Sequence, residues 1–172
     1  MRTNPRLRHL LFGAATLLVV LALPASTLAA TIEGTSGPDH LVGTADADTI
    51  SGFAGNDILE GLGGADGIRG GSGRDVIKGG SGADRASGGP GADAIHGGSG
   101  PDVLYGGDGP DAIAGGTGRD FVYGGYGNDV IQVGRDSTAD AVRSGPGWDV
   151  AYLGRHDIAD RSCERVIRTL ED

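Results

Sequence analysis

The sequence has few of the residues that build the core of a conventional enzyme. Only 5% of its 172 residues are aromatic, and it contains a single tryptophan and a single methionine. A globular domain with so few large side chains buries too little apolar surface to offset the chain entropy that folding removes. The composition therefore argues against a conventional enzyme core.

Cysteine, proline and positive charge are scarce as well. Cys163 is the single cysteine, so the chain cannot form an internal disulfide. Seven prolines without a three-residue period exclude collagen. The 14 Lys and Arg residues stand against 23 Asp and Glu, which leaves a formal net charge of −9. An acidic chain repels nucleic acid and anionic membranes, so cations are the favoured partners.

The first thirty residues differ in kind from the rest. Three arginines stand among the first eight residues, the mostly apolar run Leu10–Leu23 follows, and small residues lead up to Ala29 and Ala30. This layout predicts a secretory signal peptide over residues 1–29, hence a secreted, extracellular protein. The alternative is a membrane anchor, but a helical span needs about 20 apolar residues. Stable membrane insertion is therefore not expected.

Glycine is what the chain has in excess, with 35 residues, and its spacing is regular. From Gly34 to Gly124 a glycine recurs every nine residues, which defines eleven nonapeptides over residues 34–132. The unit reads GGxGxDxUx, where U is a large aliphatic residue, and Gly70–Lys78 is a complete example. A disordered glycine-rich linker would not hold an aspartate and an aliphatic residue in phase through eleven units.

Each position of the unit has a physical role. Glycines at positions 1, 2 and 4 permit positive φ and close backbone approach, so we expect six residues in a tight turn. The last three residues form a short strand, whose middle residue points opposite to its neighbours. Position 8 should therefore face a core, with positions 7 and 9 in solvent. Two units make one 18-residue coil, and stacked coils predict an all-β fold, a parallel β-roll or β-solenoid.

These repeats resemble the RTX, or haemolysin-type, calcium-binding nonapeptide family. The resemblance covers residues 34–132 and implies a β-roll with Ca²⁺ held between the turns of neighbouring coils. Its expected metal-binding residues are the aspartates at position 6: Asp39, Asp48, Asp57, Asp66, Asp75, Asp84, Asp93, Asp102, Asp111, Asp120 and Asp129.

The chemistry of these aspartates also favours calcium. Aspartates on the same side of the roll are 18 residues apart, so they form two rows in which consecutive members are one strand spacing apart. The carboxylates within such a row repel one another unless cations lie between them. Ca²⁺ accepts six to eight hard oxygens in flexible geometry, whereas Zn²⁺ prefers Cys and His, and Mg²⁺ tolerates irregular cages poorly. One ion between consecutive members of a row gives at most nine sites. Asp46 replaces the position-4 glycine, which makes the Asp48 turn the least regular.

Residues 133–172 leave the nine-residue period, and we expect a degenerate repeat and a C-terminal cap there. Ser144–Tyr152 reads as one further degenerate unit, while Asp136 and Asp140 are out of register. This tail resembles the ends of small secreted actinobacterial proteins with the same repeats. In those proteins the position of Ser144 is commonly a cysteine that could pair with the equivalent of Cys163. Here that partner is missing, so Cys163 is a lone thiol.

No catalytic constellation stands out, so we expect a protein that is not an enzyme. The glycine runs lack the G-K-[ST] ending of a phosphate loop, and no G-x-S-x-G elbow is present. The predicted function is a secreted calcium-binding repeat protein whose folding is coupled to Ca²⁺. Two alternatives remain: a surface adhesion or interaction module with a protein or glycan partner, and a haemolysin- or toxin-type accessory protein. The sequence has no long apolar, pore-forming segment after residue 30, which counts against the toxin alternative.

Overall fold

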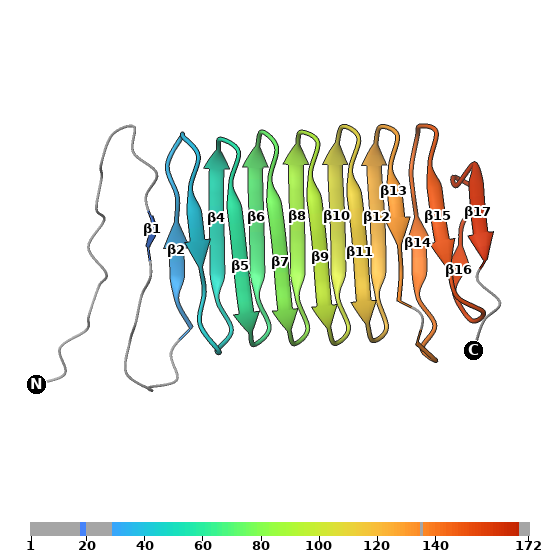
Figure 1. Ribbon diagram of the computed structural model, residues 1–172, viewed down its shortest axis with the longest axis horizontal. Coiled ribbons are helices and arrows are strands. Elements are labelled where there is room, and N and C mark those ends of the chain that lie inside the picture. Colours follow the sequence, from blue (N-terminus) through green and yellow to red (C-terminus); the bar gives the residue numbers. More distant parts are fainter. Residues whose placement is uncertain (1–17, 20–28, 135, 169–172) are drawn as a thin grey trace, which may run out of the picture.

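A computed structural model shows the chain as a long, flat stack of parallel strands (Figure 1). It describes residues 18–19, 29–134 and 136–168. The predicted signal peptide lies largely outside the described residues. No helix occurs in the described ranges, and none of their segments forms a helix that is long and apolar enough to cross a membrane.

The strands follow one another at short intervals along the described chain. They are β1 (Leu18–Val19), β2 (Thr31–Glu33), β3 (His40–Val42), β4 (Thr49–Ala54), β5 (Ile58–Gly63), β6 (Gly67–Ser72), β7 (Val76–Ser81), β8 (Arg85–Pro90), β9 (Ala94–Ser99), β10 (Val103–Asp108), β11 (Ala112–Thr117), β12 (Phe121–Tyr126), β13 (Val130–Gln132), β14 (Ala141–Arg143), β15 (Val150–Leu153), β16 (Ile158–Ala159) and β17 (Arg165–Arg168).

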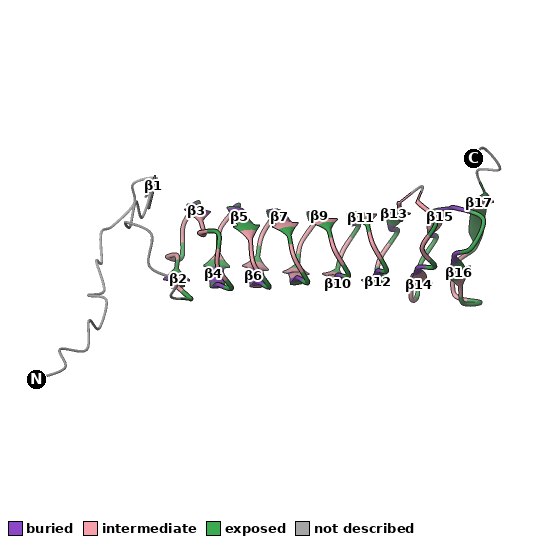
Figure 2. Ribbon diagram, turned by 90° about the horizontal axis from the view of Figure 1, so that it is seen from below, coloured by how far each residue is buried: buried purple, intermediate pink, exposed green. Residues whose placement is uncertain are grey.

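Successive strands alternate between two parallel sheets. The odd-numbered strands β1 to β17 form a nine-stranded sheet, and the even-numbered strands β2 to β16 form an eight-stranded sheet. Figure 2 shows the two sets on opposite sides of the stack. Within each sheet the register is one 18-residue coil, as where Ile77 pairs with Ile95 and Leu104 with Val122. The predicted parallel β-solenoid is confirmed.

The core is a column of single aliphatic side chains between the sheets. The position-8 residues of all eleven units are buried, from Leu41 to Ile131. Ala86, the one small residue in this series, is also fully buried. The pattern follows from the strand geometry, because the middle residue of each three-residue segment points inward and its neighbours point outward. The prediction for position 8 is therefore confirmed.

The strands are longer than the sequence predicts. In most units they run for six residues, from position 7 through position 3 of the next unit, as in β7 and β9. The glycines at positions 1 and 2 remain in the sheet, because Gly80 pairs with Gly98 one coil further on. Only about three residues then make the turn, and every coil presents nearly its whole backbone to its neighbours.

The glycines meet two different requirements. Position 1 keeps an ordinary φ but lies so close to the next coil that a Cβ there would strike neighbouring oxygens, as at Gly52. Positions 2 and 4 have positive φ in most units, as at Gly80 (115°) and Gly82 (139°). Phe53 and Leu62 occupy position 2 at φ 74° and 76°, so these two units reach the same conformation without glycine.

One prediction compares two glycines of similar depth in the stack. A Cβ at Gly82 would overlap the carbonyl oxygen of Gly64, and its φ of 139° disfavours any L side chain. Gly67 has open space around its Cβ position, with Asp48 O at 3.9 Å as the nearest atom. Gly82→Ala should lower the free energy of unfolding by ~2 kcal/mol or more. Gly67→Ala should leave it unchanged or raise it by up to ~1 kcal/mol. Urea unfolding in calcium measures both, and equal losses would contradict this assignment.

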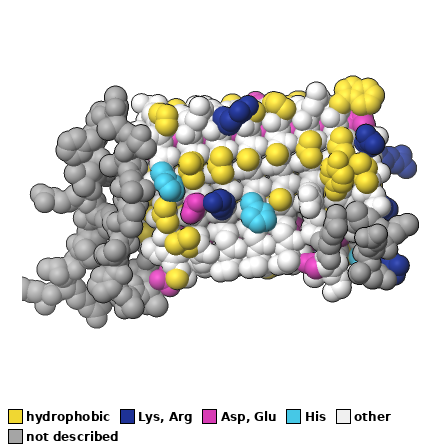
Figure 3. Space-filling model, viewed as in Figure 1, with side chains coloured by type: hydrophobic (Ala, Val, Ile, Leu, Met, Phe, Trp, Pro, Cys, Tyr) yellow, Lys and Arg dark blue, Asp and Glu magenta, His cyan; other side chains and the backbone are white. Residues whose placement is uncertain are grey.

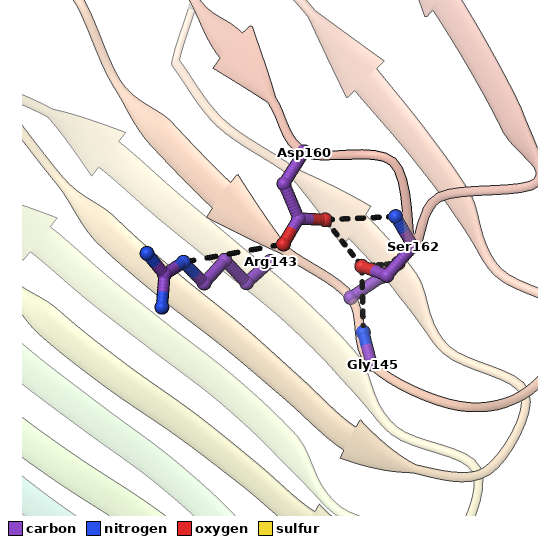
Figure 4. A network of polar contacts seen from close by, with 5 residues as sticks. Arg143, Gly145, Asp160 and Ser162 are labelled. Atoms are coloured by element: carbon purple, nitrogen blue, oxygen red, sulfur yellow. Dashed lines mark hydrogen bonds and ion pairs between the residues drawn. The ribbon is translucent and has the colours of Figure 1, made fainter.

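The two sheets continue past the regular repeats. Strands β14 and β16 extend the eight-stranded sheet, and β15 and β17 extend the nine-stranded sheet. A network of polar contacts holds the last segment against the preceding coil (Figure 4). The Asp160 carboxylate accepts a hydrogen bond from Ser162 N (2.9 Å) and lies 3.9 Å from Arg143 Nε, while Gly145 N donates to Ser162 Oγ (3.0 Å). Residues from 141 onwards therefore form further coils of the same stack.

Candidate metal-binding turns

The eleven predicted aspartates lie in two straight rows inside the roll. Every one of them is buried, with between 0% and 3% of its surface exposed. The first row contains Asp39, Asp57, Asp75, Asp93, Asp111 and Asp129, and the second contains Asp48, Asp66, Asp84, Asp102 and Asp120. The structure brings together the residues that the nine-residue period assigned to one side of each turn.

A ladder of hydrogen bonds fixes one oxygen of each carboxylate after Asp39. The backbone N–H of every aspartate donates to Oδ1 of the aspartate one coil further on, as from Asp75 to Asp93 (2.8 Å) and from Asp84 to Asp102 (2.8 Å). Each carboxylate from Asp57 onwards is thereby oriented by the aspartate one coil before it, and Ala30 N takes this role for Asp48 (2.7 Å). This bond depends on the 18-residue spacing, since it joins the same position of two stacked units.

The second oxygen faces a space that only glycine leaves open. A Cβ on Gly52 would contact Asp57 Oδ2 and lie 2.5 Å from the carbonyl oxygen of Gly70. The same pair of oxygens, one carboxylate and one glycine carbonyl, surrounds Gly79 and Gly97. The missing side chain at position 1 thus brings two hard oxygens from neighbouring coils close together.

Most of these second oxygens have no hydrogen-bond donor. The buried, unpartnered Oδ2 atoms belong to Asp57, Asp66, Asp75, Asp84, Asp93, Asp102, Asp111, Asp120, Asp129, Asp140 and Asp149. A buried acceptor without a partner costs about 1–3 kcal/mol, and more when it is charged. A row of such oxygens is unfavourable by itself and becomes favourable if cations lie among them.

Burial also raises the pKa of several of these carboxyl groups. Loss of solvent raises the pKa of Asp66, Asp93, Asp102 and Asp120 to about 6, against an ordinary value of 3.8. The same cause raises the pKa of Asp111 and Asp140 to about 7. The neighbouring aspartates add to the rise, and the backbone N–H from the preceding coil opposes it. Without a cation, these buried carboxylates therefore take up a proton more readily than a free aspartate does.

The rows extend beyond the repeats that the sequence marks out. Asp120 N donates to Asp140 Oδ1 (2.8 Å) and Asp129 N to Asp149 Oδ1 (2.9 Å), each over 20 residues instead of 18. Asp140 reads as out of register in the sequence but continues the second row. The sequence does indicate this assignment, because the aliphatic Val142 follows Asp140 by two residues, as position 8 follows position 6 in the repeat. Residues 133–143 are thus one unit with two extra residues.

The arrangement fits calcium better than other cations. No three His, Cys, Asp or Glu side chains converge on one point in the ranges that the structure describes. An ion between two coils would therefore draw on the stacked carboxylates and otherwise on backbone carbonyls. Ca²⁺ accepts such mixed oxygen sets, whereas structural Zn²⁺ requires four side-chain ligands of the Cys and His type. The residues present fit a calcium ion that bridges neighbouring turns.

Fold and turns together define a parallel β-roll suited to cations. Residues 33–68, 69–104 and 105–137 match the family profile of the RTX calcium-binding nonapeptide repeat, which spans four copies of the unit. The match covers more than half of the chain, and the chain belongs to this family. It is a calcium-binding β-roll protein, of a class that is typically structural and not catalytic. No curated protein matches the chain significantly.

A second prediction compares an interior aspartate of one row, Asp102, with the first aspartate of the other row, Asp39. Asp102 accepts the N–H of Asp84, so Asp102→Ala leaves that buried donor unpaired, at about 1–3 kcal/mol. Asp39 Oδ1 receives no such bond from any described residue. Asp102→Ala should therefore lower both calcium affinity and the free energy of unfolding more than Asp39→Ala. Calcium titration and urea unfolding of both variants test this, and equal losses would refute the stacked-row arrangement.

Proposed function

We propose that this protein is secreted and binds several calcium ions between its stacked turns, and that its folding is coupled to their binding. The observation that carries this is the set of buried Oδ2 atoms without a donor, which from Asp57 to Asp111 each lie beside a glycine carbonyl of the next coil. The aspartate rows hold the ions, and one ion between consecutive members of a row gives at most about nine. The protein has no enzymatic role in this proposal.

Calorimetric titration of the chain without residues 1–29 tests calcium binding directly. Calcium should bind at several sites per chain, whereas magnesium at the same concentration should bind weakly, since it gives up its water ligands reluctantly. An absence of calcium binding, or equal binding of both ions, would overturn the proposed function. The count of bound calcium ions also tests the upper limit of about nine.

Secretion and the capping role of the tail complete the proposal. The basic, apolar and small-residue segments before Ala30 support export. Protein recovered from the medium of an expressing culture should begin at Ala30 or Thr31.

The tail supports a cap because β16 and β17 are the last strands of their sheets and would cover the edges of the coils before them. Removal of residues 143–172 should raise the calcium concentration required for folding.

A second candidate function, an interaction module, is supported by the outer face of the nine-stranded sheet. Position 7 of the odd-numbered strands holds an unbroken apolar series whose members pair coil by coil (Figure 3). These are Ile58, Val76, Ala94, Ala112 and Val130, and all are exposed. A flat apolar row of this kind is characteristic of contact surfaces. Val76→Lys should reduce binding to a partner or surface without changing calcium binding.

A further inference from the structure

The turns of the roll are of two kinds, which differ in the contacts of the second carboxylate oxygen. In three turns a backbone N–H inside the same unit donates to it: Thr35 N to Asp39 Oδ2 (2.6 Å), Thr44 N to Asp48 Oδ2 (2.6 Å) and Gly154 N to Asp157 Oδ2 (2.5 Å). We call these the closed turns. In the open turns, from Asp57 to Asp149, this oxygen is buried and has no donor.

The conformation of the second residue of each unit separates the two kinds. Position 2 has positive φ in the open turns of the regular repeats, including the two with Phe53 and Leu62. Thr35 and Thr44 are β-branched and do not adopt positive φ, because their side chains would collide with the backbone. Gly154 also lies outside this region. The open turn of Asp140, in the unit with two extra residues, is the exception, since Gly134 has no positive φ.

The threonine side chains close the first two turns further. Thr35 Oγ1 and Thr44 Oγ1 each lie 3.0 Å from the same Oδ2 that the backbone N–H contacts. That oxygen therefore already has two donors, and a cation beside it would lie next to hydrogens instead of acceptor oxygens. Calcium needs six to eight oxygens, so a closed turn is a poor binding site.

We propose that calcium binds only among the open turns and that the closed turns at the two ends of the roll bind none. This inference rests on the proposed function and changes its ligand set. Asp39 and Asp48 leave the set, although they match the repeat, and Asp140 and Asp149 join it, although they lie outside the regular period. The open turns form two rows, one with Asp57, Asp75, Asp93, Asp111, Asp129 and Asp149, the other with Asp66, Asp84, Asp102, Asp120 and Asp140.

The closed turns then stabilise the ends of the roll without calcium. At each end of the roll, the last turn of a row has a neighbouring turn on one side only, so an ion bound there would have fewer ligands. Hydrogen bonds from the protein itself take the place of the ion. The first coil has both of its turns closed by threonine, and Asp157 closes the second row at the other end.

The variant Thr35→Gly tests the closed turn at Asp39. It gives residues 34–39 the sequence GGSGPD, which residues 97–102 already have in an open turn. Calorimetric titration should show one more calcium ion per chain than in the parent. Thr117→Gly is the matched control, because Thr117 is exposed at position 3 of an open turn, and it should leave the ion count unchanged. An unchanged count in Thr35→Gly would overturn the inference.

Asp149→Asn tests the added site at the other end. The amide keeps an acceptor for Asp129 N but replaces the second oxygen with a donor. Trp148 is the single tryptophan and adjoins this turn, so indole-sensitised terbium luminescence reports ions bound there. Asp149→Asn should lose that emission and one calcium ion, whereas Asp48→Asn, the matched change in a closed turn, should lose neither.

The outcomes separate this inference from the function on which it rests. If the parent chain binds no calcium and no terbium, the proposed function fails. If the parent binds both but Asp48→Asn loses an ion, or Asp149→Asn loses none, the assignment of open and closed turns is wrong while calcium binding stands. If Asp149→Asn does not fold, Thr35→Gly alone decides, because it restores the repeat consensus.

Discussion

A calcium chelator is expected to convert the roll, without residues 1–29, into a largely disordered chain. Only one aliphatic side chain per nine residues enters the core, while consecutive carboxylates within each buried row repel one another. A single site saturated at one hundred times its Kd stabilises the fold by about 2.7 kcal/mol. Several such sites together equal the whole stability of an ordinary domain, about 5–15 kcal/mol. Far-UV circular dichroism should show the β signal vanish with chelator and return cooperatively with calcium.

Magnesium in place of calcium is the control for a general effect of charge screening. It should restore little of the β signal at the same concentration, because it demands a regular octahedral shell. A chain that keeps its full β signal in excess chelator would contradict the coupling of folding to calcium. The roll would then be stable by its sheets alone.

Calcium should also reverse the pH dependence of stability. In the metal-free roll, burial raises the folded-state pKa of Asp66, Asp102 and Asp111 to between about 6 and about 7, well above the ordinary 3.8. A raised folded-state pKa means that stability is greatest below the unfolded value and falls as the pH rises through the folded one. One pKa unit corresponds to about 1.4 kcal/mol, so each carboxylate changes the folding equilibrium by more than tenfold. Metal-free protein should therefore gain β structure between pH 7.5 and 4.5.

With saturating calcium the sign is opposite. The ion binds the ionised carboxylate and depresses its folded-state pKa, so stability is present above about pH 4 and declines as protons displace the ion. Urea unfolding at a series of pH values, with dialysed metal-free protein beside calcium-saturated protein, measures both slopes. Slopes of the same sign would show that the buried carboxylates do not control the stability of the roll.

Much of this architecture follows from the nine-residue period alone. The period predicts the parallel roll, the buried position 8 and the two aspartate rows, because a strand alternates its faces and two units complete one coil. Strand length was predicted wrongly: glycines at positions 1 and 2 pair across coils as strand residues, and composition alone assigns them to turns.

The irregular units were harder to predict. Asp140 stands 20 residues after Asp120, and only the stack shows that the two extra residues leave the register of the strands intact. The difference between Thr35 and Phe53 at position 2 also depends on backbone conformation. Both depart from glycine, but the β-branched residue avoids positive φ and the aromatic one adopts it. Sequence patterns treat both as equal departures from the consensus.

The strands lie across the long axis of the stack, with β1 and β2 at one end and β17 at the other (Figure 1). A pulling force applied through the two ends would therefore peel off one coil at a time instead of shearing the sheets. Each 18-residue coil adds about 4.8 Å to the folded length but about 60 Å when extended. This geometry predicts that the roll lengthens in steps of one coil. With folding coupled to calcium as proposed, the force required for each step should rise with the calcium concentration.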